Sequence, residues 1–284
     1  MEINQLLKTG VDMIKNREYG NPVLEATMVL ESLLNVNRIY IYTHGKEKVD
    51  KAIEDEFLKI MEKRATGYPI QYILKEKEFM GLNFYIEEGV LIPRPDTEIL
   101  VEYILKYIDI NYGNREVKLL DLGFGSGAIV LSIAHYKRQV QAFGVDNSDI
   151  ALKVANINMN KFKLENVKLY RGDLFSGIEG IDEKFHIIVS NPPYIPSEEI
   201  KNLQKEVRDF EPVAALDGGE DGLDFYRKII PQSRKYLKDN GLLIFEIGWD
   251  QGKAVSNILL QEDFNNIKIL KDLQGLDRVV LGIK

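Results

Sequence analysis

A short segment of the chain combines an amide side chain, two prolines and an aromatic ring directly after a run of strand-forming residues. It reads IIVSNPPYIP, in which Asn191, Pro192, Pro193 and Tyr194 follow the run. The prolines fix φ and remove two N–H donors, so the segment is stiff and leaves its carbonyls free. The Asn191 side chain adds an amide oxygen and an amide donor. Tyr194 adds a flat ring and a hydroxyl.

These groups suit one kind of substrate, a planar NH2 group. The lone pair of such a nitrogen is delocalised into the neighbouring π system, which makes it a poor nucleophile. The Asn191 side-chain oxygen and the Pro192 carbonyl are each expected to accept one N–H, which orients the nitrogen and stabilises the positive charge that develops as a methyl group arrives. Tyr194 is expected to hold the planar group by stacking. The segment predicts an amino or amide N-methyltransferase; the plain alternative is a rigid loop with a packed tyrosine.

A glycine-rich turn upstream has the pattern of a nucleoside-binding site. In LLDLGFGSGAIVLSIA, Gly123, Gly125 and Gly127 lie between a predicted strand and a predicted helix. Glycines there let the backbone turn tightly and approach a ligand at the helix N-terminus. Asp146 follows Gly127 by 19 residues and ends the next predicted strand. A carboxylate at that place accepts hydrogen bonds from a ribose diol.

The glycine turn alone leaves two ligands open. Gly123, Gly125 and Ala128 also fit the GxGxxG/A pattern of dinucleotide-binding proteins. Gly127 and the preceding Asp121 instead favour the DxGxGxG form of proteins that bind S-adenosylmethionine (SAM). The NPPY segment follows the fourth strand of the alternating region, and ligands of open α/β sheets bind beyond the carboxyl ends of the strands. A dinucleotide-dependent oxidoreductase would leave NPPY without a chemical role, so SAM is the favoured ligand.

The third predicted strand ends in GDLF, which supplies two more candidate contacts. In a SAM site the Asp173 carboxylate is expected beside the adenine, where it accepts from the exocyclic amine. Leu174 is expected to supply an apolar wall or a backbone donor. The structural alternatives are that Asp173 caps a turn and that Asp146 caps the following helix.

The elements that must position these groups fall into two regions. Residues 1–76 predict successive amphipathic helices and form an N-terminal helical domain. Residues 77–94 contain EFMGLNFYIEEGVLIP, which predicts a β-hairpin linker. From residue 95 a helix begins after two prolines, with Asp96 as its expected N-cap.

Within residues 95–284, strands then alternate with helices from Val117 onward. This alternation predicts βαβ units and a mostly parallel sheet covered on both faces, which is an α/β fold of the Rossmann type. The final two strands, NIKILKDL and DRVVLGIK, have no helix between them and predict an antiparallel hairpin at one sheet edge.

Composition excludes several classes of protein. The chain has 284 residues, no cysteine and only three histidines, so thiolate chemistry is excluded and a metal site is not expected. There is no apolar run long enough to cross a membrane and no signal-peptide pattern, and a cytoplasmic location is expected. The net charge of −7 lowers the expectation of nucleic acid as a direct substrate, because nucleic-acid-binding proteins neutralise phosphates with basic side chains.

The motifs and their flanks resemble the PrmC (HemK) family. The segments are YPIQYILKEKEFMGLNFYIEEGVLIPRPDTEILVE, DLGFGSGAIVLSIA, NPPYIP, FEPVAALDGGEDGLDFYRKII, FEIGWDQG and DLQGLDRVVLG. The resemblance implies a class I SAM-dependent methyltransferase fold with a seven-stranded sheet. It also implies methylation of the side-chain amide (N5) of the glutamine in the Gly-Gly-Gln motif of class-one peptide chain release factors, and thus a role in translation termination. The N-terminal helical domain would help to dock that protein substrate.

The resemblance also implies a set of site residues. The glutamine would be held by Asn191, Pro192, Pro193 and Tyr194. The cofactor contacts would be Asp121, Gly123, Phe124, Gly125, Ser126, Gly127, Asp146, Asp173, Leu174 and Asn191. Phe124 and Leu174 depart from the residues more frequent in the family, which puts contacts near the methionine moiety and adenine stacking in question. Arg94 and Glu246 are open between a role in the site and a structural role.

Two other functions are alternatives to a release factor glutamine methyltransferase. A nucleic-acid amino-methyltransferase, acting on adenine N6 or cytosine N4, would use the same NPPY chemistry, but the acidic balance and the lack of an evident basic insertion disfavour it. A binding module without catalysis is disfavoured because the groups needed for the chemistry are all present.

Overall fold

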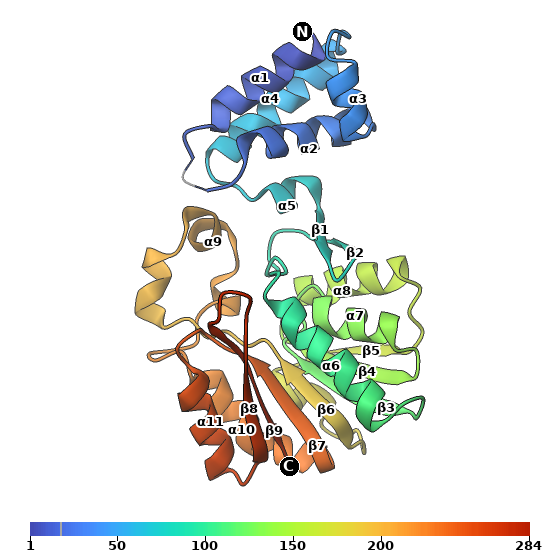
Figure 1. Ribbon diagram of the computed structural model, residues 1–284, viewed down its shortest axis with the longest axis vertical. Helices are drawn as coiled ribbons and strands as arrows, with labels where there is room; N and C mark the ends of the chain where they lie inside the picture. Colours follow the sequence, from blue (N-terminus) through green and yellow to red (C-terminus); the bar gives the residue numbers. More distant parts are fainter. Residues whose placement is uncertain (18) are drawn as a thin grey trace. The chain divides into compact units, whose positions relative to one another are not determined.

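The computed structural model describes residues 1–17 and 19–284. The chain forms two compact units (Figure 1). The first contains Met1–Lys75 and also Gln204–Phe210, and the second contains Glu76–Leu203 and Glu211–Lys284. The predicted hairpin therefore groups with the second unit, and a segment from the second half of the chain groups with the first.

The first unit is helical. Its helices are α1 (Ile3–Ile14), α2 (Pro22–Leu34), α3 (Arg38–Thr43), α4 (Lys51–Ala65), α5 (Ile70–Leu74) and α9 (Lys205–Phe210). The amphipathic patterns predicted α1, α2 and α4, and these helices are confirmed. Helix α1 buries Ile3, Leu6, Gly10 and Ile14 on one face. A Cβ atom at Gly10 would lie 2.5 Å from Cζ of Phe57, so glycine allows α1 and α4 to pack closely.

A buried ion-pair network joins three helices of this unit. Arg64 in α4 is only 1% exposed. Its Nε lies 2.9 Å from Glu25 Oε2 in α2, and its Nη2 lies 2.8 Å from Glu206 Oε1 in α9. The ring of Phe210 packs edge-on against Tyr68, with centroids 5.3 Å apart. These contacts explain why the short helix α9 belongs to the first unit.

The second unit is built on a seven-stranded sheet with the order β5-β4-β3-β6-β7-β9-β8. The strands are β3 (Val117–Leu122), β4 (Val140–Asp146), β5 (Val167–Arg171), β6 (Phe185–Ser190), β7 (Leu237–Glu246), β8 (Asn265–Lys271) and β9 (Asp277–Ile283). Strands β3 to β7 pair in parallel, whereas β9 is antiparallel to both β7 and β8. The predicted sheet and its edge hairpin are confirmed.

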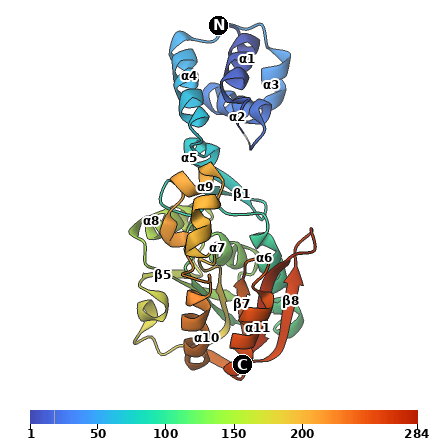
Figure 2. The ribbon, with the colours of Figure 1, turned by 90° about the vertical axis from the view of Figure 1, so that its left-hand side faces the viewer.

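Helices cover both faces of this sheet. They are α6 (Thr97–Asn111), α7 (Ala128–Tyr136), α8 (Asp149–Lys161), α10 (Asp224–Tyr236) and α11 (Gly252–Gln261). Helices α6, α7 and α8 cover one face and α10 and α11 the other (Figures 1 and 2). The central strands β3 and β6 are nearly continuous apolar runs because both of their faces are buried. The short 3₁₀ segments are η1 (Leu174–Ile178), η2 (Ser197–Asn202) and η3 (Val213–Ala215).

The predicted hairpin is formed by β1 (Glu76–Phe79) and β2 (Leu82–Tyr85), which pair antiparallel. It is fixed to α8 by Asn158, whose Oδ1 accepts from the Tyr85 N–H at 2.6 Å and whose Nδ2 donates to the Tyr85 carbonyl at 3.0 Å. Phe84 packs edge-on against Phe162 just beyond the same helix.

The start of α6 differs from prediction in one detail. The helix begins at Thr97 with Asp96 at its N-cap position, as expected, but the Asp96 side chain makes no capping hydrogen bond. The Asp96 backbone is already helical, with φ −62° and ψ −28°, whereas a capping residue is usually extended. Its carboxylate instead lies 3.4 Å from Nη2 of Arg278.

Candidate active site

The predicted site residues gather at one edge of the sheet of the second unit. Strand β3 has β4 on one side and β6 on the other, and its last residue, Leu122, pairs with Val145 and Ser190. The loops that follow these three strands therefore begin next to one another, at the place where the strand order reverses. They line a cavity of about 220 Å³ within this unit.

The three glycines of the turn serve two different purposes. All three have positive φ: 76° at Gly123, 55° at Gly125 and 83° at Gly127. A Cβ atom at Gly123 or Gly125 would have no atom within 4 Å, and both residues line the cavity together with Ser126. At Gly127 a Cβ atom would lie 2.7 Å from Cδ1 of Leu131. Gly123 and Gly125 thus leave open space for a ligand, whereas Gly127 allows α7 to start.

Phe124 lines the cavity but is almost fully buried. Its ring packs over the backbone of Gly144 in β4, where an added Cβ atom would lie 2.9 Å from the ring. The large residue at this position of the turn is therefore accommodated by a glycine in the neighbouring strand.

Asp121 lies outside the residues that line the cavity. It is fully buried, and its Oδ2 accepts a hydrogen bond from the Val130 N–H of α7 at 3.2 Å. Its Oδ1 has no hydrogen-bond partner among the described residues. Burial raises the pKa of this carboxyl to about 8. Asp121 therefore connects β3 to α7 and has a structural role.

Asp146 ends β4 and faces the cavity. Its Oδ2 accepts from the Gly125 N–H at 2.8 Å, and its Oδ1 accepts from the Ser148 N–H at 2.9 Å. Burial raises the pKa of this carboxyl, and the backbone donors act in the opposite direction. The two backbone donors hold the Asp146 side chain in place. Because each carboxylate oxygen has a second lone pair, Asp146 can still accept from two further donors.

Asp173 and Leu174 follow β5 and also line the cavity. Leu174 has a φ of 50°, a left-handed conformation that is uncommon for a residue other than glycine. The Asp173 N–H donates to Ser176 Oγ at 3.0 Å, which helps to fix this turn. Such locally constrained backbone is frequent where a protein holds a ligand.

The NPPY segment leaves β6 at the same edge. Asn191, Pro192 and Pro193 line the cavity. Asn191 Nδ2 donates to Thr97 Oγ1 at 3.5 Å. From the described parts of the chain, neither Asn191 Oδ1 nor the Pro192 carbonyl receives a hydrogen bond. The two acceptors that the chemistry requires are therefore available.

Tyr194 lies behind this surface and does not line the cavity. Its ring packs against the core on the α10 face of the sheet, and its hydroxyl donates to Glu246 Oε1 at 3.4 Å. Its carbonyl accepts from Gln251 Nε2 at 2.9 Å. Burial and the adjacent Glu246 raise the pKa of Tyr194. The placement favours support of the loop over direct stacking on a substrate.

Arg94 lines the cavity and pairs with a buried acid. Its Nη2 lies 2.6 Å from Oε1 of Glu211, whose side chain is only 2% exposed. The second carboxylate oxygen of Glu211 accepts from the Ile92 N–H at 3.2 Å. Arg94 thus both faces the site and braces the segment before α6, the two roles that the sequence left open.

Three residues near the site were not singled out from the sequence: Thr97, Glu211 and Gln251. Thr97 lines the cavity and contacts Asn191, although the two are 94 positions apart. The signals for Thr97 and Glu211 were their places inside the quoted segments IPRPDTE and FEPV. Neither segment reveals a contact partner by itself.

Two other kinds of feature are not found among the described residues. In residues 1–17 and 19–284, no group of three or more His, Cys, Asp or Glu side chains is arranged to hold a metal ion. Within the same ranges, no helix is both long and apolar enough to cross a membrane.

The parallel sheet with an antiparallel β9, and a glycine turn, an acid and NPPY at one edge, define a class I methyltransferase fold. Two solved structures share it: a methyltransferase from Pyrococcus furiosus (TM-score 0.53, 16% identity, covering 75% of this chain and 93% of that one) and a 16S rRNA methyltransferase from T. thermophilus in complex with AdoMet and guanosine (TM-score 0.51, 17% identity, covering 74% and 49%). At these identities the likeness concerns the fold alone.

Sequence comparison narrows the class to one family. Residues 5–74 match the PrmC N-terminal domain, and residues 95–207 match the methyltransferase small domain. The release factor glutamine methyltransferase of Clostridium acetobutylicum is 42% identical over all of this chain and 99% of its own. That of Buchnera aphidicola is 40% identical over the whole of both chains. The chain belongs to the family of release factor glutamine methyltransferases and is a protein-glutamine methyltransferase.

Proposed function

We propose that the protein transfers a methyl group from SAM to the side-chain amide nitrogen (N5) of the glutamine in the Gly-Gly-Gln motif of class-one release factors. The observation that carries the proposal is the pair of available acceptors, Asn191 Oδ1 and the Pro192 carbonyl, on a stiff loop that lines the same cavity as the glycine turn. The relatives named above support the choice of a glutamine as the acceptor.

The residues of the cavity fit SAM. Gly123 and Gly125 leave open the space that side chains would fill, which suits the close approach of a ligand to the backbone. Asp146 is fixed by two backbone donors and suits a ribose diol. Leu174 supplies an apolar wall on the side of Asp173. When bound, SAM would supply an electrophilic methyl group from its sulfonium, and S-adenosyl-L-homocysteine would leave as the product.

The NPPY segment would then prepare the substrate nitrogen. Asn191 Oδ1 and the Pro192 carbonyl each accept one N–H of the glutamine amide, which orients the nitrogen for attack on the methyl group. Both acceptors carry partial negative charge, so they stabilise the positive charge that builds on nitrogen as its new bond to carbon forms. Because Pro192 and Pro193 fix the backbone, the acceptors need little reorganisation during the reaction.

The first unit is assigned to docking of the release factor, and the reaction to the cytoplasm, where translation is terminated. Nucleic acid is not expected as a direct substrate. The net charge of −7 supports this, since phosphate binding requires a concentration of basic side chains.

The proposal is tested by incubating the protein with methyl-labelled SAM and, in separate reactions, a class-one release factor, DNA and rRNA. Label is expected on the release factor only. A release factor whose Gly-Gly-Gln glutamine is replaced by alanine serves as the matched control and is expected to remain unlabelled. Transfer to DNA or rRNA without transfer to the release factor would contradict the proposal and favour the nucleic-acid enzyme.

A further inference from the structure

The use of Asn191 as an acceptor depends on which way its side-chain amide is turned. Nδ2 donates to Thr97 Oγ1, which leaves Oδ1 as the group available to a substrate. If the amide were reversed, Nδ2 would meet the NH2 group of the glutamine, and two donors would oppose each other. The Thr97 hydroxyl is therefore the contact that selects the productive orientation of Asn191.

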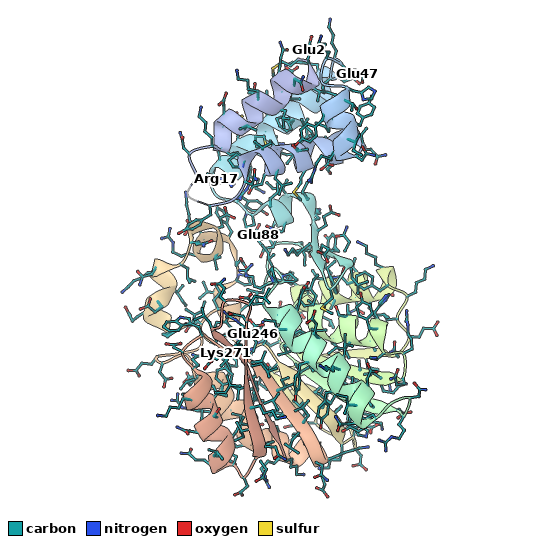
Figure 3. All side chains as sticks on the ribbon, viewed as in Figure 1. Glu2, Arg17, Glu47, Glu88, Glu246 and Lys271 are labelled. Atoms are coloured by element: carbon teal, nitrogen blue, oxygen red, sulfur yellow. The ribbon has the colours of Figure 1, made fainter. Side chains whose placement is uncertain are left out.

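Thr97 serves as an acceptor when its own hydroxyl hydrogen is directed to another group. Glu246, the last residue of β7 (labelled in Figure 3), lies beside the Thr97 hydroxyl and offers an acceptor. It is 1% exposed, and burial raises the pKa of its carboxyl, whereas the adjacent Thr97 hydroxyl and the Arg278 guanidinium lower it. A carboxylate has acceptor sites only, so it fixes the direction of each hydrogen bond that reaches it.

Glu246 also contacts the other end of the NPPY segment. The Tyr194 hydroxyl donates to Glu246 Oε1 at 3.4 Å. The position of the acid is itself fixed, because the Tyr226 hydroxyl donates to the Glu246 backbone carbonyl at 2.9 Å. Glu246 Oε2 is buried without a hydrogen-bond partner among the described residues, so the acid has capacity left for a closer contact.

We infer that Thr97 and Glu246 are positioning residues, which hold Asn191 and Tyr194 so that the NPPY segment presents its acceptors to the glutamine amide. The inference rests on the proposed function and concerns residues that the sequence either passed over or left open. The present distances of 3.4 and 3.5 Å are long for hydrogen bonds. Such contacts commonly tighten when substrate binds.

The experiment compares Thr97→Val, which removes the hydroxyl at nearly constant volume, with Thr97→Ser, which retains it. With labelled SAM and a release factor, Thr97→Val is expected to lower kcat roughly 10- to 100-fold, because Asn191 loses its preferred orientation. KM for the release factor and Kd for SAM are expected to stay within about twofold, and Thr97→Ser is expected to restore most of kcat. Ser233→Ala, which removes a buried hydroxyl from α10, is the control and leaves kcat unchanged.

A second variant keeps the inference falsifiable if Thr97→Val perturbs folding. Glu246→Gln replaces an acceptor by a group that also donates, and a similar loss of kcat is expected. Since both residues act through one network, the double variant is expected to lose little more than either single variant. Equal kcat in wild type and Thr97→Val, or strictly multiplicative losses in the double variant, would overturn the inference alone. Absence of transfer by the wild type would contradict the proposed function and this inference together.

Discussion

At the scale of single residues, Asn191 carries the largest expected effect on turnover. Asn191→Ala removes one of the two acceptors for the glutamine amide, and kcat is expected to fall about 100- to 1000-fold, the usual effect of deleting one preorganised transition-state contact. The fold is expected to persist, because the Asn191 side chain makes a single long hydrogen bond to the described residues. Single-turnover transfer from labelled SAM measures the loss.

Asn202→Ala is the control for that measurement, because Asn202 is an exposed residue of η2 whose amide donates to Glu199. Its rate is expected to match the wild type. A wild-type rate in Asn191→Ala would refute the amide-clamp chemistry.

Asp121 gives the protein a stability that depends on pH. The pKa of its buried carboxyl is raised to about 8, whereas an aspartate in an unfolded chain titrates near about 3.9. Between these values the unfolded state binds fewer protons than the folded state, so the free energy of unfolding falls as pH rises. The contribution from one proton is at most about 1.4 kcal/mol per pH unit. Asp121→Asn is expected to flatten this slope.

Urea unfolding at pH values between 5 and 8, spaced by roughly one pH unit, measures the slope. Asp250→Asn, at an exposed acid, is expected to leave the slope unchanged. An identical slope in wild type and Asp121→Asn would show that Asp121 is ionised in the folded protein.

The sequence identified the site residues whose roles follow from their spacing along the chain. Gly123, Gly125 and Asp146 follow from a strand–turn–helix pattern and a fixed distance to the next strand tip. Thr97 and Glu211 were not found, because their contacts with Asn191 and Arg94 join residues 94 and 117 positions apart. Such pairs are brought together only by the order of the strands.

At the scale of elements, the glycine turn separates ligand binding from stability. Gly125→Ala and Gly127→Ala each force a left-handed residue, at a cost of about 1–2 kcal/mol. Only Gly127→Ala also brings a methyl group to 2.7 Å from Leu131. It is therefore expected to lower the urea midpoint further than Gly125→Ala does. Gly125→Ala is expected to weaken SAM binding instead, because its methyl group enters the open space of the cavity.

The two variants act as controls for each other, with stability measured by urea unfolding and affinity by calorimetric titration with SAM. An equal loss of stability in both would show that Leu131 moves aside at no cost. The sequence predicted a mostly parallel sheet because buried strands and amphipathic helices alternate strongly. It did not predict α3, α5 or the 3₁₀ segments, since elements of three to six residues carry too few turns to show a period.

At the scale of the whole molecule, the chain enters the first unit twice. After the long N-terminal segment, it returns at Gln204 and leaves again after Phe210. The loop that follows NPPY thus contributes α9 to the helical unit before the chain continues to Glu211, the partner of Arg94. This return was not predicted, because KEVRDF is a short polar segment and Arg64, the partner of Glu206, lies 142 positions away from it.

Helix α9 is expected to be held in the first unit mainly by the ion pair between Arg64 and Glu206. Glu206→Gln removes one charge from the buried network, but Arg64 keeps its pair of contacts with Glu25. The first unit is therefore expected to remain folded, while α9 detaches more often and the amide hydrogens of residues 205–210 exchange faster by about fivefold or more, as for a segment that opens locally.

Arg64→Met is expected to lower the free energy of unfolding far more, by about 3–5 kcal/mol, because Glu25 and Glu206 both lose the Arg64 guanidinium as their partner. Hydrogen exchange followed by mass spectrometry on the full chain distinguishes the two variants. Glu198→Gln, at an exposed acid paired with Lys201 in η2, is the matched control and should leave exchange in α9 unchanged. Unaltered exchange in Glu206→Gln would mean that the packing of Phe210 on Tyr68 holds the segment without the ion pair.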